Sequence, residues 1–258
     1  MAKLKTAEEI ELLRNSNILV SKTLAEIAKV IEPGISTLKL DQLAEEFIRD
    51  HHAIPAFKGY HDFPATLCTS VNEQVVHGIP SNYILKEGDI VSVDCGVFLN
   101  NYVGDSAFTF AIGNISKETE NLLKATRESL FKGIEKAVHG MRMGDLANAV
   151  QNHVEQLGYS VVREMVGHGI GTKLHEAPEV PNYGRKGNGI KLEAGMVLCI
   201  EPMINMGKKE IVQENDGWTI RTVDRKPSAH FELAVAVGLK EAQVLSTFDY
   251  IEEVLKNK

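Results

Sequence analysis

The chain has 258 residues, of which 43% are hydrophobic and 24% charged, a composition typical of one large globular domain or two small ones. Its formal net charge of -7 and its scattered lysines and arginines exclude a surface for nucleic-acid phosphates, which requires clustered basic side chains. The N-terminal residues lack the apolar core of a secretion signal, and no stretch approaches the roughly 18 apolar residues of a membrane span, so a soluble cytoplasmic protein is expected.

Two pairs of helices are predicted, one pair opening each half of the chain. Thr6 and Glu9 form a capping box, and apolar residues recur at near-helical spacing to about Val30, before Glu32-Pro33-Gly34 stops the helix. A second amphipathic helix follows, and the same helix, stop and helix plan recurs after residue 115. The four helices are expected over residues 6–30, 38–50, 116–138 and 144–156.

Strands are predicted after each helix pair, because the hydrophobic pattern changes there to a period of two. Asn100-Asn101 between two such runs tolerates the positive φ angles of a two-residue hairpin turn. The strands are expected near residues 66–71, 89–99, 102–112, 161–166, 196–204, 218–224 and 229–237.

Two segments repeat one motif, a hydrophobic strand that ends in a carboxylate. They are Leu85–Asp94 and Leu192–Glu201, and their acids lie 107 positions apart (201 − 94). Gly34 and Gly140, which follow matching helices, lie 106 positions apart (140 − 34). Because two pairs of matching residues are separated by nearly the same number of positions, the sequence indicates an internal repeat.

The repeat predicts an α+β fold in which helix pairs cover one antiparallel sheet and the acids lie at its middle. Since no Ser- or Gly-rich linker separates the halves, about residues 6–113 and 114–240, a single catalytic domain over residues 1–258 is expected. The three cysteines, Cys68, Cys95 and Cys199, cannot pair completely and are expected to be reduced core thiols.

The predicted hairpin brings two aspartates together. In its register Asp94 faces Ala107, and Asp105 lies two residues from Ala107 on the same face. The two aspartates are therefore diagonal neighbours, roughly 7–8 Å apart at the backbone. Their carboxylates can meet at one ion or at a pair of ions.

Four further residues are candidates for the same centre. His168 lies among glycines that are expected to turn the backbone and project its imidazole inward, and His175 follows seven residues later. Glu201 and Glu232 each interrupt an apolar strand. Four convergent carboxylates would repel one another strongly, by up to about 4 kcal/mol per pair at 4 Å, unless two divalent cations cancelled their charge. Metals bridged by carboxylates turn a shared water into a hydroxide nucleophile near neutral pH, which is hydrolytic chemistry.

An ordered set of motifs covers essentially the whole chain. The motifs are Lys58-Gly-Tyr60, Phe63-Pro, Cys68-Thr-Ser-Val-Asn72, Val76-His77-Gly-Ile-Pro80, Val93-Asp94-Cys-Gly, Asp105, Gly167-His168-Gly-Ile-Gly, His175-Glu-Ala-Pro, Ile200-Glu201-Pro and Phe231-Glu232. This set resembles the methionine aminopeptidases, within the pita-bread metallopeptidases. It looks like the type I bacterial form, since neither a long N-terminal extension nor a large insertion between Glu201 and Glu232 is present.

The resemblance implies a role for each candidate ligand. Asp94 would hold one metal ion, His168 and Glu201 the other, and Asp105 and Glu232 would bridge the two. Glu201 would also relay the proton of the nucleophile as general base and then acid. The ions would be Fe, Mn, Co or Zn, among which the ligand types do not discriminate.

The resemblance also implies a substrate site. His77 and His175 would not be ligands but would flank the scissile amide and stabilise the tetrahedral intermediate. Two departures, Leu174 where several relatives have an aromatic residue and Phe57 where some have cysteine, alter the expected dimensions of the methionine pocket. The pocket residues would be Tyr60, Phe63, Cys68, Leu174 and Trp218.

The implied activity is removal of the initiator methionine from nascent chains whose second residue is small. Such an enzyme would act on the N-termini of nascent peptides, and one possibility is that it does so at the ribosome. A type I chain without an extension or insertion would most simply be a monomer. One alternative is an Xaa-Pro peptidase, although those relatives usually carry an extra domain for which there is no room before Asp94. Another is a non-catalytic peptide- or ribosome-binding module, which would not need the intact ligand set.

Overall fold

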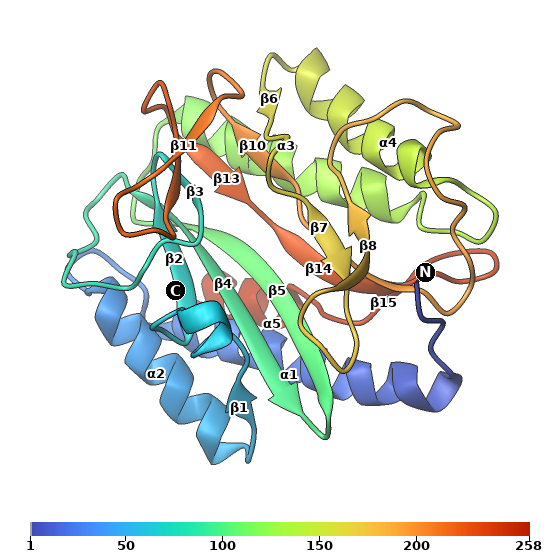
Figure 1. The fold of residues 1–258 in the computed structure, drawn as a ribbon. Coiled ribbons are helices and arrows are strands. Elements are labelled where there is room, and N and C mark those ends of the chain that lie inside the picture. Colours follow the sequence, from blue (N-terminus) through green and yellow to red (C-terminus); the bar gives the residue numbers. More distant parts are fainter. Residues whose placement is uncertain (1) are drawn as a thin grey trace.

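Residues 2–258 are described by a computed structural model, in which five α-helices and one short 3-10 helix form (Figure 1). The predicted capping box is present, since the Thr6 side chain accepts from the backbone N–H of Glu9 and the Glu9 carboxylate accepts from that of Thr6. Among these residues, no helix is both long and apolar enough to cross a bilayer. The helices are α1 (Ala7–Val30), α2 (Thr37–Asp50), η1 (Tyr60–Asp62), α3 (Lys117–Ile134), α4 (Met143–Gln156) and α5 (Asp249–Lys256).

A nine-stranded antiparallel sheet runs through both halves of the chain. Its order is β1-β4-β5-β14-β9-β7-β8, with β2 also paired to β4 and β15 to β14. Within this sheet the first half meets the second where β5 pairs with β14, a junction called the seam below. The strands are β1 (Ile54–Pro55), β2 (Leu67–Val71), β4 (Ile90–Leu99), β5 (Tyr102–Ala111), β7 (Gly167–Gly169), β8 (Glu176–Val180), β9 (Val197–Ile200), β14 (Glu232–Ala236) and β15 (Gln243–Val244).

Two small three-stranded sheets accompany the large one. Their orders are β13-β10-β6 and β11-β12-β3. Figure 1 shows the second of them beside the end of β2, with the loop that joins β11 to β12 projecting from it. Their strands are β3 (Gln74–Val76), β6 (Ser160–Val161), β10 (Met203–Asn205), β11 (Ile211–Gln213), β12 (Ile220–Thr222) and β13 (Ser228–His230).

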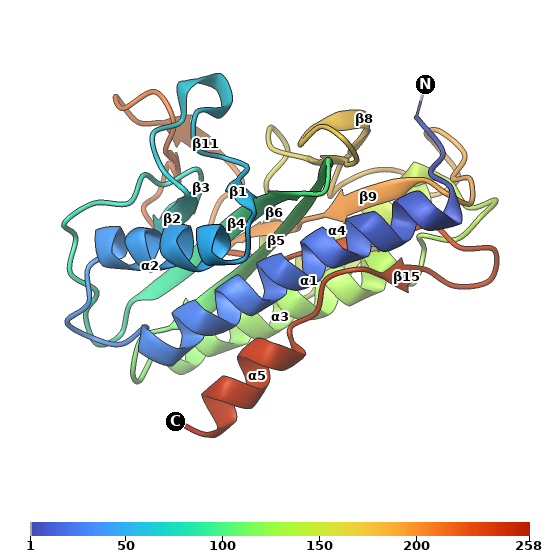
Figure 2. The ribbon, with the colours of Figure 1, turned by 90° about the horizontal axis from the view of Figure 1, so that it is seen from below.

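The helices cover one face of the large sheet, and short strands and loops rise from the other (Figure 2). The side chains of β4 alternate between the two faces of the sheet. Those on the helix-covered face are fully buried in the core: Val91, Val93, Cys95 and Val97. Asp94 lies between them in sequence and so points to the opposite face. The expected α+β architecture, with helices covering one face of an antiparallel sheet, is confirmed.

The predicted hairpin is confirmed in detail. Leu99 pairs with Tyr102 and Asp94 with Ala107, as the two-residue turn requires. Asn100 and Asn101 have φ angles of 50° and 67°, the left-handed conformation that asparagine tolerates. The turn residues therefore set the register that brings Asp94 and Asp105 to one face of the sheet.

Some predicted strands are shorter or broken. The strand expected over 161–166 is wrong beyond Val161, because the chain leaves the sheet there and Glu164 to Val166 line a cleft. The strand over 196–204 breaks at Glu201-Pro202, where proline has no N–H for the ladder. The strand over 229–237 breaks at Phe231, and helix α5 was not predicted.

Candidate metal centre and active-site cleft

Two of the acids lie on the β4–β5 hairpin. Asp94 pairs across β4 and β2 with Cys68, and Asp105 on β5 has its backbone N–H bonded to the side-chain oxygen of Asn17, 3.1 Å away. Asn17 is fully buried in α1, so the helix holds the strand at the position of the acid. The hairpin register, together with the contact of Asp105 with α1, thus fixes the backbone positions from which the two carboxylates project.

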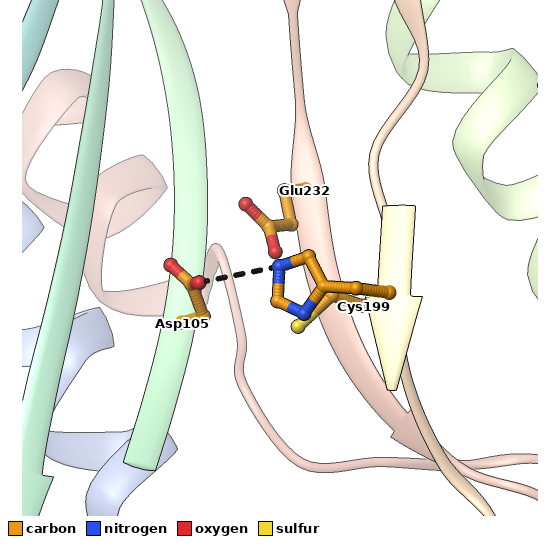
Figure 3. A group of neighbouring side chains, drawn as sticks. Asp105, Cys199 and Glu232 are labelled. Atoms are coloured by element: carbon orange, nitrogen blue, oxygen red, sulfur yellow. Dashed lines mark ion pairs between the residues drawn. The ribbon is translucent and has the colours of Figure 1, made fainter. Parts of the chain in front are cut away.

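The other two acids come from the second half. Glu201 follows β9, and its carbonyl oxygen accepts from Asn182 Nδ2 at 2.9 Å. Glu232 opens β14, pairs with Ala107 across the seam, and accepts at its carbonyl oxygen from Ser106 Oγ at 2.6 Å. Figure 3 shows Asp105 and Glu232 directed toward one another from their two strands, with Cys199 close by.

His168 projects from β7 into the same space. Its Nδ1 lies 3.0 Å from the carbonyl oxygen of Gly169, which can only accept, so Nδ1 carries the proton and Nε2 offers its lone pair. Nε2 lies 3.7 Å from Asp105 Oδ2, the approach drawn as a dashed line in Figure 3, and 3.6 Å from Glu201 Oε1.

The glycines around His168 do not form the turn that was expected. Gly167 and Gly169 belong to strand β7 and lack positive φ angles. A Cβ on Gly167 would collide with the carbonyl of Cys199, and one on Gly169 with that of Ala177. Their role is therefore close approach of neighbouring strands, which lets a short strand carry the imidazole between them.

The four carboxyl groups are held in a setting that disfavours their charge. Burial raises the pKa of Asp94 to about 7, although the adjacent Asp105 carboxyl acts to lower it. Burial, followed by neighbouring carboxylates, raises the pKa values of Asp105, Glu201 and Glu232 well above their usual range. These acids can be ionised together only if positive charge lies between them.

The donor set fits divalent cations. Three buried carboxylate oxygens, Asp94 Oδ1, Asp105 Oδ1 and Glu232 Oε1, have no hydrogen-bond partner, which is costly unless a cation binds them. Asp105, His168 and Glu232 offer ligand atoms that lie, with the sulfur of Cys199, within 4.8 Å of one another. Oxygen and imidazole donors suit Mn, Fe, Co or Zn, and two such ions would balance four carboxylates.

Cys199 also lies beside this cluster. Burial, and then the charge of Glu232, raises the pKa of its thiol well above the usual range. Cys199 is free and fully buried among apolar side chains, as expected from the sequence.

A cleft of about 590 Å³ opens above the acids. It is lined by every residue for which the sequence predicted a role in the metal centre or the substrate site, together with Phe57. Those residues are Tyr60, Phe63, Cys68, His77, Asp94, Asp105, His168, Leu174, His175, Glu201, Trp218 and Glu232.

One side of the cleft is apolar. Phe63 and Trp218 meet edge to face with ring centroids 5.1 Å apart, and Leu174 and Cys68 are buried beside them. Tyr60, Phe63, Cys68, Leu174 and Trp218 are together called the apolar wall below. Such a wall has the size and character to receive an unbranched apolar side chain.

Two histidines stand between the apolar wall and the acids. The Tyr60 hydroxyl lies 2.8 Å from His175 Nδ1, and the rings of His168 and His175 have centroids 4.2 Å apart. His77 has a φ of 60°, an unusual conformation for histidine that directs its side chain into the cleft. Burial lowers the pKa of His77 to about 4 and also lowers that of His175, so both imidazoles are neutral near pH 7.

Sequence reasoning missed three supporting contacts. Asn182 and the Tyr60 hydroxyl position Glu201 and His175 through bonds that no local pattern encodes. The third residue, His230, is buried with its Nε2 3.7 Å from Glu201 Oε2. The two-residue spacing of His230 and Glu232 does not place them on one face of a strand, because the predicted strand breaks at Phe231 and leaves His230 at the end of β13 and Glu232 at the start of β14.

A sheet with carboxylates and an imidazole converging under a cleft defines a hydrolytic metalloenzyme. Residues 11–238 match the model of metallopeptidase family M24. The methionine aminopeptidase of Clostridium perfringens is 55% identical over 94% of this chain and 98% of its own length, and methionine aminopeptidase 1 of Bacillus subtilis is 49% identical over 90% and 94%. The chain belongs to metallopeptidase family M24 and, within it, to the methionine aminopeptidases.

Solved structures agree with this assignment. The crystal structure of a methionine aminopeptidase from Thermotoga maritima superposes with a TM-score of 0.94 at 41% identity, over 96% of this chain and all of that one. An Xaa-Pro dipeptidase from Bacillus anthracis reaches a TM-score of 0.77 at 21% identity and is covered over only 62% of its length. The second likeness shows a shared fold alone.

Proposed function

We propose that this protein is a metalloaminopeptidase that removes the N-terminal methionine from peptides whose second residue is small. The observation that carries the proposal is the convergence of five candidate ligands beside an apolar wall in one cleft. The curated relatives that match most of the chain are named for the same activity.

Asp94, Asp105, His168, Glu201 and Glu232 would hold two divalent cations. When bound, the cations would supply Lewis-acid activation of a water and of the scissile carbonyl. Glu201 would accept the proton of that water and deliver it to the departing amine, because its Oε1 faces the centre next to His168.

His77 and His175 would hold the scissile amide. Both imidazoles are neutral near pH 7 and each can donate an N–H to an oxygen that gains negative charge. The Tyr60 hydroxyl, 2.8 Å from His175 Nδ1, would fix the ring so that its Nε2 points into the cleft. The apolar wall would receive the methionine side chain.

The chain would act as one catalytic domain over residues 1–258, with halves 6–113 and 114–240 each supplying acids to the centre. We expect it to work as a monomer on nascent N-termini in the cytoplasm, where reduced thiols such as Cys68 persist. Ribosome association remains a prediction of the family resemblance.

A metal add-back experiment tests the proposal. Protein stripped with a chelator would receive Mn, Fe, Co or Zn singly and then Met-Ala-Ser or an Xaa-Pro peptide. We expect methionine release only with metal present. Activity confined to the Xaa-Pro peptide would favour the prolidase alternative, and no activity with any metal would contradict the proposal.

A further inference from the structure

His230 is a buried imidazole that the proposed reaction does not use. Its side chain is 2% exposed, and its Nε2 has no hydrogen-bond partner. An unpaired polar atom at this depth is costly, so a partner is expected for it. Within residues 2–258, no hydrogen-bond partner lies in range of this nitrogen.

The backbone of His230 is fixed by one neighbour. Thr109 Oγ1 donates to the carbonyl oxygen of His230 at 2.6 Å and accepts from its N–H at 3.0 Å. Ser92 Oγ lies 2.8 Å from the same hydroxyl, so the contact is anchored to the β4–β5 hairpin. The imidazole is therefore held beside the acids rather than placed there by a mobile segment.

The distance from His230 to Glu201 is characteristic of two ligands of one ion. Nε2 lies 3.7 Å from Glu201 Oε2, beyond the 2.7–3.2 Å of a hydrogen bond. Ligands that each lie about 2.0–2.2 Å from an ion are roughly 3–4 Å apart. His168, a predicted ligand, shows the same spacing, 3.6 Å to the other oxygen of Glu201.

The Glu201 carboxylate thus lies between two imidazoles, with Oε1 toward His168 and Oε2 toward His230. Glu201, His230 and Glu232 offer ligand atoms that are all within 4.8 Å of one another. We propose that His230 is a sixth metal ligand of this centre, binding through Nε2 together with Glu201 and Glu232. This inference rests on the proposed metalloenzyme function.

A second imidazole ligand would alter which divalent metal ion the centre prefers, but it would not alter the net charge of the ligand set. A neutral nitrogen adds no charge to the balance between four carboxylates and two divalent cations. Imidazole favours Zn, Fe and Co over Mn, for which oxygen ligands suffice. Replacing His230 should therefore weaken binding of Co²⁺ more than binding of Mn²⁺.

Metal titration of the whole protein tests the inference without relying on activity. Chelator-treated protein with ¹⁵N-labelled histidine would be titrated with Zn²⁺ and followed by NMR of the imidazole nitrogens. We expect Nε2 of both His168 and His230 to become metal-bound. His168→Gln and His230→Gln each assign one signal, and His153→Gln, which replaces a histidine bound to Glu128 on a surface helix, is the matched control.

Calorimetry supplies a second measurement on the same variants. His230→Gln should weaken Co²⁺ binding by at least about tenfold and Mn²⁺ binding less, with His153→Gln unchanged. Binding of Zn²⁺ by His168 alone, or equal Co²⁺ affinity in His230→Gln, would overturn the inference and leave the metal centre intact. A titration in which neither nitrogen binds would overturn the proposed centre itself. If one variant fails to fold, the other still assigns its signal, and the number of metal-bound Nε2 signals in the native spectrum, none, one or two, separates these outcomes.

Discussion

The candidate ligands and the apolar wall line one cleft but come from different kinds of structure. The acids and His168 lie in, or directly beside, strands of the large sheet, whose register is set by paired backbones. In the apolar wall, Cys68 lies in strand β2 of that sheet, but Tyr60 begins a short 3-10 helix that Phe63 follows, and Trp218 lies in the loop between β11 and β12. The centre is thus determined by the sheet, whereas the wall can change with its loops. We infer that the chemistry is rigidly specified and that side-chain selectivity is the adjustable property.

The strongest test of this contrast is Glu201→Gln in the centre. We expect kcat for Met-Ala-Ser to fall about 10²–10⁴-fold, because the amide cannot relay a proton, while KM changes much less. Steady-state kinetics with saturating metal would measure both. Glu193→Gln, an exposed glutamate in the same repeated motif, is the control. A rise in KM alone would assign Glu201 to substrate binding instead.

An intermediate effect is expected from Trp218→Ala in the apolar wall. The variant loses the edge-to-face contact with Phe63 and part of the surface facing the methionine side chain. We expect kcat/KM to fall about 10–100-fold, chiefly through KM, with metal affinity unchanged. Trp218→Phe should recover much of the loss. A change in Co²⁺ affinity measured by calorimetry would show that wall and centre are not independent.

The smallest effect should come from a carboxylate that lies outside both regions. Glu9 caps α1 and binds Lys3, and backbone and side-chain hydrogen bonds lower its pKa to about 2, opposite in sign to the buried acids of the centre. Its contribution to stability is therefore complete above the unfolded value near 4.5 and is lost as the pH falls toward 2. Glu9→Gln should cost less than about 1 kcal/mol near pH 7.

Urea unfolding of the wild type and Glu9→Gln over a pH series measures this contribution. The difference in unfolding free energy should be constant near neutrality and shrink below about pH 4.5. A difference that grew on acidification would mean that Glu9 is not stabilised in its charged form.

Much of the centre could be predicted because its geometry is local. Asn100-Asn101 specifies the hairpin turn, and the turn determines that Asp94 and Asp105 share a face. The ligand motifs also occur in order along the chain, and the structure brings all of them to one cleft.

The contacts that could not be predicted join residues far apart in sequence. Asn182 reaches the Glu201 carbonyl across 19 positions and Tyr60 reaches His175 across 115, so no periodicity reports either. The glycines beside His168 were misinterpreted as a turn, because sequence alone does not reveal that a neighbouring backbone occupies the space of their missing side chains.

The seam between the two halves has only two paired positions, Glu232 with Ala107 and Leu233 with Ser106. The Ser106 and Thr109 hydroxyls supplement it by donating to the carbonyls of Glu232 and His230. Ions held by Asp105 on one side and Glu232 on the other would add to the contacts between the halves, which also include the pairing of β3 with β12. Cation binding to the folded protein would then raise its free energy of unfolding by mass action. Removal of the metal would therefore lower the stability of the fold as well as abolish activity.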